Sequence, residues 1–178
     1  MIDVKMWGRA LDRMPRLSLQ EWQRLDPVAK WLIACRASVL FMTFTAAALG
    51  GLLAWRQGLF QWDLWLATVL GLMFAHATNN LLNDWTDSRR GIDHDNYYRN
   101  QYGVHVLEDG LMDEAQFWRY LGCTAAVALG LGAWLISERA GLTLDLMLAG
   151  AFFVLFYTWP LKYYGLGEPA VLLVWGPL

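Results

Sequence analysis

Residues 64–87 of this chain are LWLATVLGLMFAHATNNLLNDWTD, and the part from 64 to 83 carries no charged side chain. A helix needs about 20 largely apolar residues to cross about 30 Å of hydrocarbon, at 1.5 Å per residue. Uncharged runs of similar length occupy 37–55, 120–137 and 146–161. The sequence therefore predicts an all-α fold, a polytopic bundle of transmembrane helices.

The composition also favours a membrane protein. Of the 178 residues, 57% are hydrophobic, 17% are charged and 11 are tryptophan. A soluble helical protein would need amphipathic outer helices, and the sequence contains no candidates for such a layer. A net charge of −2 without a basic run argues against a nucleic-acid partner. Cys35 and Cys123 fall within apolar segments, where a thiol is usually a packing group, so they indicate neither disulfides nor a metal site.

We divide the chain into an N-terminal cytoplasmic or interfacial segment, 1–27, and a partial transmembrane domain, 28–178. The predicted spans lie near 31–55, 63–86, 114–137 and 144–161, with an incomplete fifth at 168–178. A helix of this last length would reach only about half of the bilayer. We therefore expect the natural protein to continue beyond Leu178.

The N-terminal segment contains local signals for helices. Ser18 followed by Glu21 predicts a capping box, and Asp26 followed by Pro27 predicts the N-cap and first turn of the first span. A short helix that ends at Pro15 would place three apolar side chains on one side and would lie on the membrane surface: Trp7, Leu11 and Met14.

Basic residues indicate the orientation in the membrane. Residues 1–30 contain six Lys or Arg and lack the apolar core of a signal peptide. One basic residue separates the first two spans, and four separate the second from the third. This alternation predicts that the N-terminus and the loop after the second span are cytoplasmic.

The second span ends in a polar helix face. At 100° per residue, His76, Asn80, Asn83 and Asp87 fall within about 60° of one another, with Asp84 at the margin of this face. One interpretation is that the two aspartates mark the exit of the helix into water, while the asparagines bind neighbouring helices. A lone histidine on a span also bonds a neighbouring helix more often than it acts as a base, so we assign no chemistry to His76.

Two observations favour a functional interpretation of the aspartates. Carboxylates are disfavoured at a helix C-terminus, where the macrodipole favours cations. Asp93 and Asp95 follow closely, and mutual repulsion would raise the pKa values of these carboxyl groups unless a cation neutralised them. Magnesium is commonly held by one or two carboxylates together with phosphate oxygens. The pattern predicts half of a site for magnesium and a diphosphate.

These residues carry a family resemblance. Asn83-Asp84-Trp-Thr-Asp87, followed by Gly91-Ile-Asp93, resembles the first aspartate-rich motif of the UbiA superfamily of intramembrane prenyltransferases, in the variant closest to 1,4-dihydroxy-2-naphthoate polyprenyltransferases. Three other parts are similar to the family: Arg36, the VLEDG segment at 106–110 and the YTWPLKYYGLGE segment at 157–168. The resemblance runs from about residue 28 to the end and covers half of a nine-helix fold, without the second aspartate-rich motif.

The resemblance implies a Mg²⁺-dependent enzyme of menaquinone-type quinone biosynthesis in the inner or plasma membrane of a prokaryote. A prenyl group would pass from a prenyl diphosphate to an aromatic acceptor such as 1,4-dihydroxy-2-naphthoate. We expect this segment to be inactive alone, because the second motif is missing. The implied metal ligands are Asp84, Asp87 and Asp93. The implied diphosphate-binding residues are Asn80, Asn83, Arg36, Arg90 and Lys162, and the catalytic residues are Asp84, Asp87 and Tyr157.

Several alternatives stay open at this stage. Lys162 is explained equally well as a cytoplasmic anchor, and Arg90 as a solvated partner of the loop carboxylates. The chain is compatible with another UbiA-type transferase that uses a different aromatic or lipid acceptor. It is also compatible with a non-enzymatic membrane protein that binds a divalent cation. A membrane CDP-alcohol phosphotransferase would need Asp-Gly and then Ala-Arg after the paired aspartates, and Ser88-Arg89-Arg90 does not provide this pattern.

Overall fold

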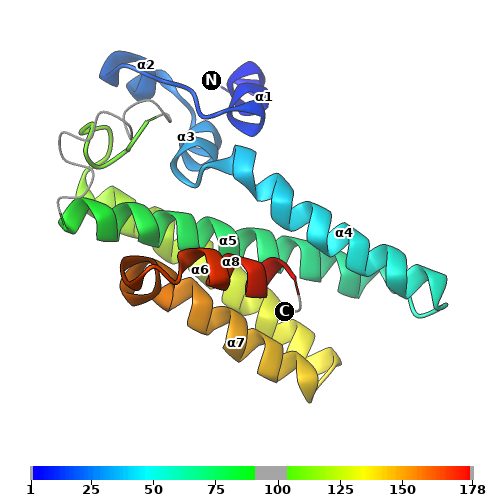
Figure 1. Cartoon of the computed structure of the whole chain (residues 1–178). Coiled ribbons are helices and arrows are strands. Elements are labelled where there is room, and N and C mark those ends of the chain that lie inside the picture. The colour runs from blue at the N-terminus through cyan, green and yellow to red at the C-terminus, as the bar shows by residue number, and fades with distance from the viewer. Residues whose placement is uncertain (1, 91–103, 177–178) are drawn as a thin grey trace. The chain divides into compact units, whose positions relative to one another are not determined.

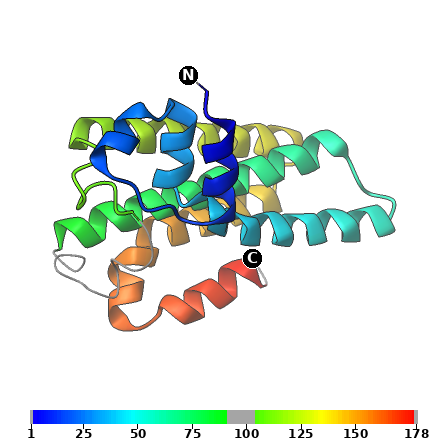
Figure 2. The ribbon, with the colours of Figure 1, turned by 90° about the horizontal axis from the view of Figure 1, so that it is seen from above.

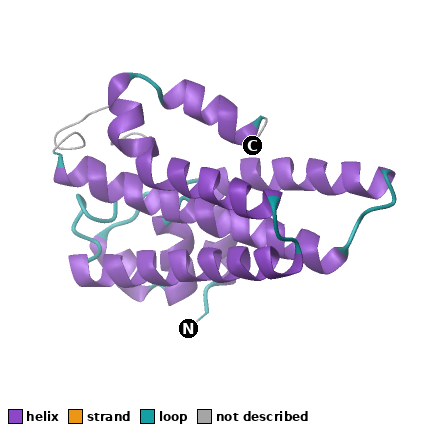
Figure 3. Ribbon diagram, turned by 90° about the horizontal axis from the view of Figure 1, so that it is seen from below, coloured by secondary structure: helices purple, strands orange, loops and turns teal. Residues whose placement is uncertain are grey.

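The computed structural model describes residues 2–90 and 104–176, and every regular element in these two ranges is helical (Figures 1 and 3). The all-α prediction is therefore confirmed. In chain order the elements are α1 (Val4–Asp12), α2 (Leu19–Arg24), α3 (Pro27–Ala34), η1 (Ala37–Val39), α4 (Leu40–Arg56), α5 (Trp62–Arg89), α6 (Glu114–Glu138), α7 (Leu142–Phe156), η3 (Tyr157–Leu161), η4 (Lys162–Tyr164) and α8 (Gly167–Trp175).

Three helical stretches in the described ranges are long and apolar enough to cross a membrane: Ala37–Arg56, Glu114–Glu138 and Leu142–Tyr164. They overlap three of the four full spans predicted from sequence. The fourth, 63–86, forms most of the 28-residue helix α5, which is not among the three. The amides and carboxylates in its second half make this helix less apolar than the others.

The chain forms two compact units. The first contains Met1–Val39 and Asn80–Gly122, and the second contains Leu40–Asn79 and Cys123–Leu178. Helix α5 continues from the second unit into the first at Asn80. The polar end of this helix, which carries both predicted metal ligands of the span, therefore belongs to the first unit.

Asp26 joins two helices of the first unit. It is the N-cap of α3, and its carboxylate accepts hydrogen bonds from the backbone N–H groups of Val28 at 2.9 Å and Ala29 at 3.0 Å. The same carboxylate accepts hydrogen bonds from the Asp3 N–H at 3.0 Å and the Trp7 indole at 3.1 Å. Helix α1 consequently lies beside α3 (Figure 2). Asp26 is confirmed as an N-cap, but α3 ends at Ala34, so the predicted first span near 31–55 is interrupted by the turn at Arg36 and its membrane-length part begins at Ala37.

The predicted capping box is also confirmed. The Ser18 hydroxyl accepts from the Glu21 N–H at 3.3 Å, and the Glu21 carboxylate accepts from the Ser18 N–H at 2.8 Å. Helix α1 ends at Asp12, before Pro15, and Arg13 is extended, so Met14, predicted on the apolar side of this helix, lies outside it. Its position on a membrane surface stays a prediction.

A glycine allows α4 to approach the beginning of α5 in the second unit. Gly51 is buried, and a Cβ atom at this position would overlap the indole of Trp65. The indole N–H donates to the carbonyl of Ala47 at 3.1 Å, which fixes the ring against α4. At the neighbouring Gly50, a Cβ atom would meet no heavy atom within 4 Å.

The two glycines provide a matched test of this packing. We expect Gly51→Ala to destabilise the protein by about 1–3 kcal/mol, because the indole of Trp65 must move. Gly50→Ala should be neutral or slightly stabilising, because alanine is the better helix former. Thermal unfolding in detergent micelles, followed by tryptophan fluorescence, would compare the variants. Equal melting temperatures for the two variants would contradict the close contact.

The carboxylate of Asp26 makes the contact between α1 and α3 sensitive to acid. Burial alone favours the neutral acid, but hydrogen bonds from Ala29, Asp3, Trp7 and Val28 lower the pKa of Asp26 from its ordinary value of 3.8 to about 2. The stabilisation is therefore complete above about pH 4 and is lost as the pH falls through about 2.

We expect the indole N–H resonance of Trp7 to shift over this pH range in an NMR titration. Asp26→Asn should abolish the shift, because the amide replaces the titrating carboxylate. Asp12→Asn, which removes an exposed carboxylate 3.8 Å from Arg13, should leave it intact. A wild-type resonance that does not change between about pH 5 and pH 2 would contradict the assignment.

Candidate functional site

The last two turns of α5 bury both aspartates of the predicted motif. The exposed fraction is 1% for Asp84 and 2% for Asp87, and Leu81 on the same helix is fully buried. The interpretation in which these aspartates mark the exit of the helix into water is therefore wrong. Two carboxylates are instead part of the core of the first unit, an arrangement that requires compensating charges or hydrogen bonds.

Arg36 forms a hydrogen-bonded ion pair with Asp84, in which its guanidinium donates to Oδ1. The Arg36 side chain is 15% exposed, so the pair is largely shielded from water. Arg36 lies between α3 and η1 with a φ of 54°, in the left-handed region that residues other than glycine rarely adopt. The Asn80 side-chain amide donates to the carbonyl of Cys35 at 2.9 Å and so holds this turn against α5. Such strain persists only where surrounding contacts enforce it.

His105 adds a third group beside Asp84. Its Nε2 lies 3.9 Å from Asp84 Oδ1, and the side chain is buried. The ring is held by its own turn, because Nδ1 accepts from the Glu108 N–H at 3.3 Å and the His105 N–H donates to the Asp109 carboxylate at 2.8 Å. Since Nδ1 accepts, a neutral His105 carries its proton on Nε2, the nitrogen that faces Asp84.

Sequence reasoning missed His105, although it directly precedes the VLEDG segment that carries part of the resemblance. That segment forms a tight turn in which the Val106 carbonyl accepts from the N–H groups of Leu111 and Met112, both at 3.0 Å. Gly110 has a φ of 63°, which suits glycine. The turn therefore explains both the glycine in this segment and the position of His105.

The carboxylates fit the protein's share of a magnesium site. Asp84 and Asp87 supply hard oxygen donors three residues apart, and magnesium commonly takes one or two carboxylates, with phosphate oxygens and water as its other ligands. Within residues 2–90 and 104–176, no group of three or more His, Cys, Asp or Glu side chains is arranged to hold a metal ion. The third predicted ligand, Asp93, lies outside the described residues.

The other predicted site residues are placed as follows. Asn83 is half-buried directly before Asp84, and Arg90 is exposed in the turn after α5. Tyr157 and Lys162 belong to the second unit, where Tyr157 begins η3 and is half-buried and Lys162 begins η4 and is exposed. Their roles in chemistry stay predictions.

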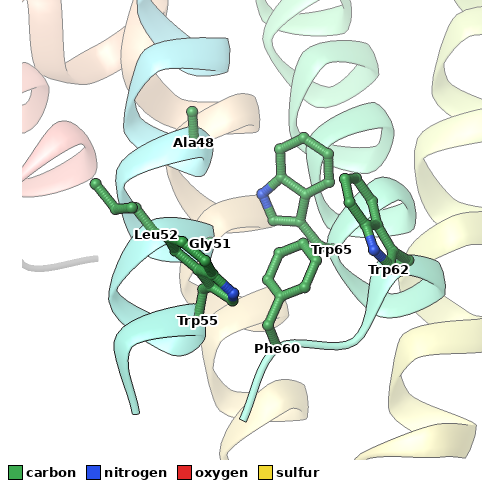
Figure 4. Close-up of a pocket in the computed structure, with 7 residues that line it drawn as sticks. All are labelled: Ala48, Gly51, Leu52, Trp55, Phe60, Trp62 and Trp65. Carbon is green, nitrogen blue, oxygen red and sulfur yellow. The ribbon is translucent and has the colours of Figure 1, made fainter. Parts of the chain in front are cut away.

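A cavity of about 310 Å³ lies in the second unit, between the end of α4 and the beginning of α5 (Figure 4). No charged side chain lines it, so it does not suit a diphosphate. Trp55 and Trp62 are 68% and 73% exposed, in agreement with the membrane-interface position that aromatic residues favour. The lining residues are Ala48, Gly51, Leu52, Trp55, Phe60, Trp62 and Trp65.

Comparisons with known proteins give a consistent result. Residues 41–178 match the UbiA prenyltransferase family. The chain is 30% identical over 176 residues to UbiA prenyltransferase domain-containing protein 1 of Mus musculus, covering 89% of this chain and 50% of the relative. It is 26% identical over 163 residues to 1,4-dihydroxy-2-naphthoate octaprenyltransferase of Escherichia coli K12, covering 86% and 52%. No solved structure matches. The chain thus spans about half the length of these curated relatives.

The ion pair between Arg36 and Asp84 provides a stability test. Arg36→Ala should cost roughly 3–5 kcal/mol, because it leaves a buried carboxylate without its guanidinium. The double replacement Arg36→Met with Asp84→Leu should recover most of this loss, because it removes both charges. Unfolding in detergent, measured by tryptophan fluorescence, would give the differences.

An exposed ion pair in the same unit serves as the control. Arg89 and Glu114 are 2.5 Å apart, with side chains 59% and 53% exposed. Arg89→Ala should therefore cost less than about 1 kcal/mol. If Arg36→Ala proved as mild as Arg89→Ala, the pair with Asp84 would not be the buried interaction described above.

Proposed function

This chain belongs to the UbiA prenyltransferase family, and from this membership we propose that it binds a prenyl diphosphate with magnesium and transfers the prenyl group to 1,4-dihydroxy-2-naphthoate. Members of this family are prenyltransferases, which supports the reaction class. The naphthoate acceptor is supported by the motif variant around Gly91 and Asp93 and by the similarity to the E. coli protein of that name.

One observation carries the proposal, which is the burial of Asp84 and Asp87, with Asp84 paired to Arg36. Ionisable groups within a helix that crosses a membrane cost free energy, so their presence there indicates a functional site. A purely structural pair would need only one carboxylate for one guanidinium. The second carboxylate, three residues along the same helix face, provides the negative charge that a divalent cation would balance.

Each residue near the carboxylates has a role in this proposal. Asp84 and Asp87, together with Asp93, would hold magnesium, and the bound ion would supply positive charge to stabilise the leaving diphosphate. Arg36 is oriented in advance by its left-handed turn and its contact with Asp84, and it would donate to a phosphate oxygen. His105 presents its Nε2–H to Asp84 and keeps the carboxylate directed toward the cluster.

The remaining predicted residues would act on the rest of the donor. The ring of Tyr157 would stabilise the allylic cation left when the diphosphate departs, an interaction worth roughly 0.5–2 kcal/mol. The polar groups proposed to contact the diphosphate, in addition to Arg36, are Asn80, Asn83, Arg90 and Lys162. In Asn80 one N–H of the amide already donates to the carbonyl of Cys35, so the second N–H is the donor that would contact a phosphate oxygen.

We further propose that residues 1–27 and the aspartate-rich end of α5 face the cytoplasm, because Lys and Arg concentrate in and around these segments. A role in menaquinone-type quinone biosynthesis in a prokaryotic inner or plasma membrane follows from the naphthoate acceptor. The relatives named above come from both a mammal and a bacterium, so this placement is narrower than the family membership.

The activity test uses the protein expressed from its complete reading frame in membranes. With magnesium, a labelled long-chain prenyl diphosphate and 1,4-dihydroxy-2-naphthoate, we expect a labelled lipophilic product that disappears when magnesium is chelated. Asp84→Asn and Asp87→Asn should each lower turnover by at least about 100-fold, because the charge that balances the cation is lost.

Asp63→Asn is the matched control, since Asp63 is exposed in the first turn of the same helix. It should leave turnover unchanged. Wild-type turnover in both the Asp84 and Asp87 variants would refute their assignment. Magnesium binding without transfer to any aromatic or lipid acceptor would favour the non-enzymatic alternative, and transfer to a different acceptor would correct the substrate alone.

A further inference from the structure

A polar cluster of three side chains lies within the second unit, apart from the carboxylates in sequence and unit. His76 on α5 contacts Thr43 on α4, with 2.7 Å between Nδ1 and Oγ1. The indole of Trp175, at the end of α8, lies edge-on to the His76 ring with 5.3 Å between ring centroids. Its Nε1 is 3.4 Å from the same Thr43 oxygen. Three helices thus meet at one histidine in a segment predicted to cross the membrane.

We assign the tautomer of His76 from the hydrogen-bond partners of Thr43. An indole N–H only donates, so Thr43 Oγ1 accepts from Trp175. The Thr43 hydroxyl then has one proton to give, and Nδ1 of His76 is the acceptor within reach. The neutral ring therefore carries its proton on Nε2. A histidine held in this form donates a hydrogen bond from Nε2 and is not available there as a base.

The Nε2–H of His76 has no hydrogen-bond partner among residues 2–90 and 104–176. The ring is half-buried, so this N–H is accessible. An N–H group in an apolar environment is destabilising unless it donates to an acceptor, and within a bilayer water seldom provides that acceptor. The site therefore suits a ligand that brings an oxygen atom together with an apolar or aromatic body.

We propose that His76 binds the aromatic acceptor by donating its Nε2–H to a hydroxyl or carboxylate oxygen of that molecule. The inference rests on the proposed function, because that function supplies the ligand. Helical periodicity places His76 on the same face of α5 as Asn83 and Asp87, about 16 Å before Asp87 along the helix axis.

The ring of Trp175 and the hydroxyl of Thr43 complete the site without contributing charge. Trp175 provides an aromatic wall next to the imidazole, and offset or edge-on aromatic contacts stabilise such rings. Thr43 acts as a positioning residue, because it holds the ring and its tautomer through Nδ1. His76 accepts no proton in this arrangement, so the proton that leaves the acceptor ring during alkylation must go to another base or to water.

The first experiment needs no turnover. The chain has 3 histidines, so ¹⁵N NMR of protein labelled at histidine would resolve His76, assigned by its loss in His76→Gln. We expect Nδ1 of His76 to be unprotonated and Nε2 protonated at neutral pH. Thr43→Val should mix the two tautomers, whereas Thr45→Val should not, because Thr45 bonds only the Phe41 carbonyl of its own helix. A proton on Nδ1 in the wild type would overturn the inference.

The second experiment measures binding of labelled 1,4-dihydroxy-2-naphthoate and, where transfer occurs, the KM for each substrate. His76→Phe keeps an aromatic ring but loses the donor, and it should weaken acceptor binding by about tenfold while the KM for the prenyl diphosphate stays unchanged. His76→Gln supplies an amide N–H in place of Nε2–H and should restore acceptor binding to within about threefold.

The outcomes separate this inference from the proposed function. Wild-type acceptor binding in His76→Phe would overturn the role of His76, whether or not transfer is observed. Equal loss of kcat in His76→Gln and His76→Phe, with acceptor binding intact, would overturn it as well, since that result requires a base. Absence of transfer in the wild type, with acceptor binding that depends on His76, would count against the reaction alone.

Discussion

The structure of the first unit depends on one interaction, which compensates the buried carboxylate of Asp84. Asp84 is 1% exposed, and a charged group in such a position is tolerated only with a partner and well-formed hydrogen bonds. Arg36 provides the partner, and its position requires a left-handed backbone that a Cβ-bearing residue normally avoids. The contact between Asn80 and Cys35 and the turn that holds His105 are consequences of the same requirement, because they fix the groups around this oxygen.

The two halves of the 28-residue helix α5 have different packing requirements. Its first half must be apolar, and there it packs closely enough against α4 that Gly51 has no room for a side chain. Its last turns must keep carboxylates and amides away from lipid. The three-residue spacing of Asp84 and Asp87 accomplishes this, because it turns both side chains toward the core of the first unit. His76 lies between these halves, and contacts from Thr43 and Trp175 hold its ring from within the second unit.

Local features were predictable from sequence and long-range partners were not. The helix caps at Ser18 and Asp26 depend on residues within three positions of each cap, so the local sequence alone identifies them. The helical period identified the polar face of α5, and the expectation that His76 bonds a neighbouring helix is confirmed by Thr43 on α4. Arg36, the partner of Asp84, however, lies 48 residues away in the sequence. Helical periodicity predicts which face of α5 is polar, but it does not predict which residues pack against that face. His105 was missed for the same reason, because a single histidine in a loop belongs to no periodic pattern that would predict where its side chain points.

Charge balance explains why the cluster contains an arginine as well as two aspartates. Asp84, Asp87 and Arg36 together carry a formal charge of −1, and His105 lies beside Asp84. In the proposed function this charge would attract a divalent cation, and the sum over these three side chains and the ion would then be positive, which would favour binding of a diphosphate. Without Arg36, a divalent cation would be neutralised by the two aspartates and would leave no excess positive charge for a diphosphate. In the proposed function, the left-handed turn at Arg36 would therefore be the structural condition for binding an anion at a site built from acidic residues.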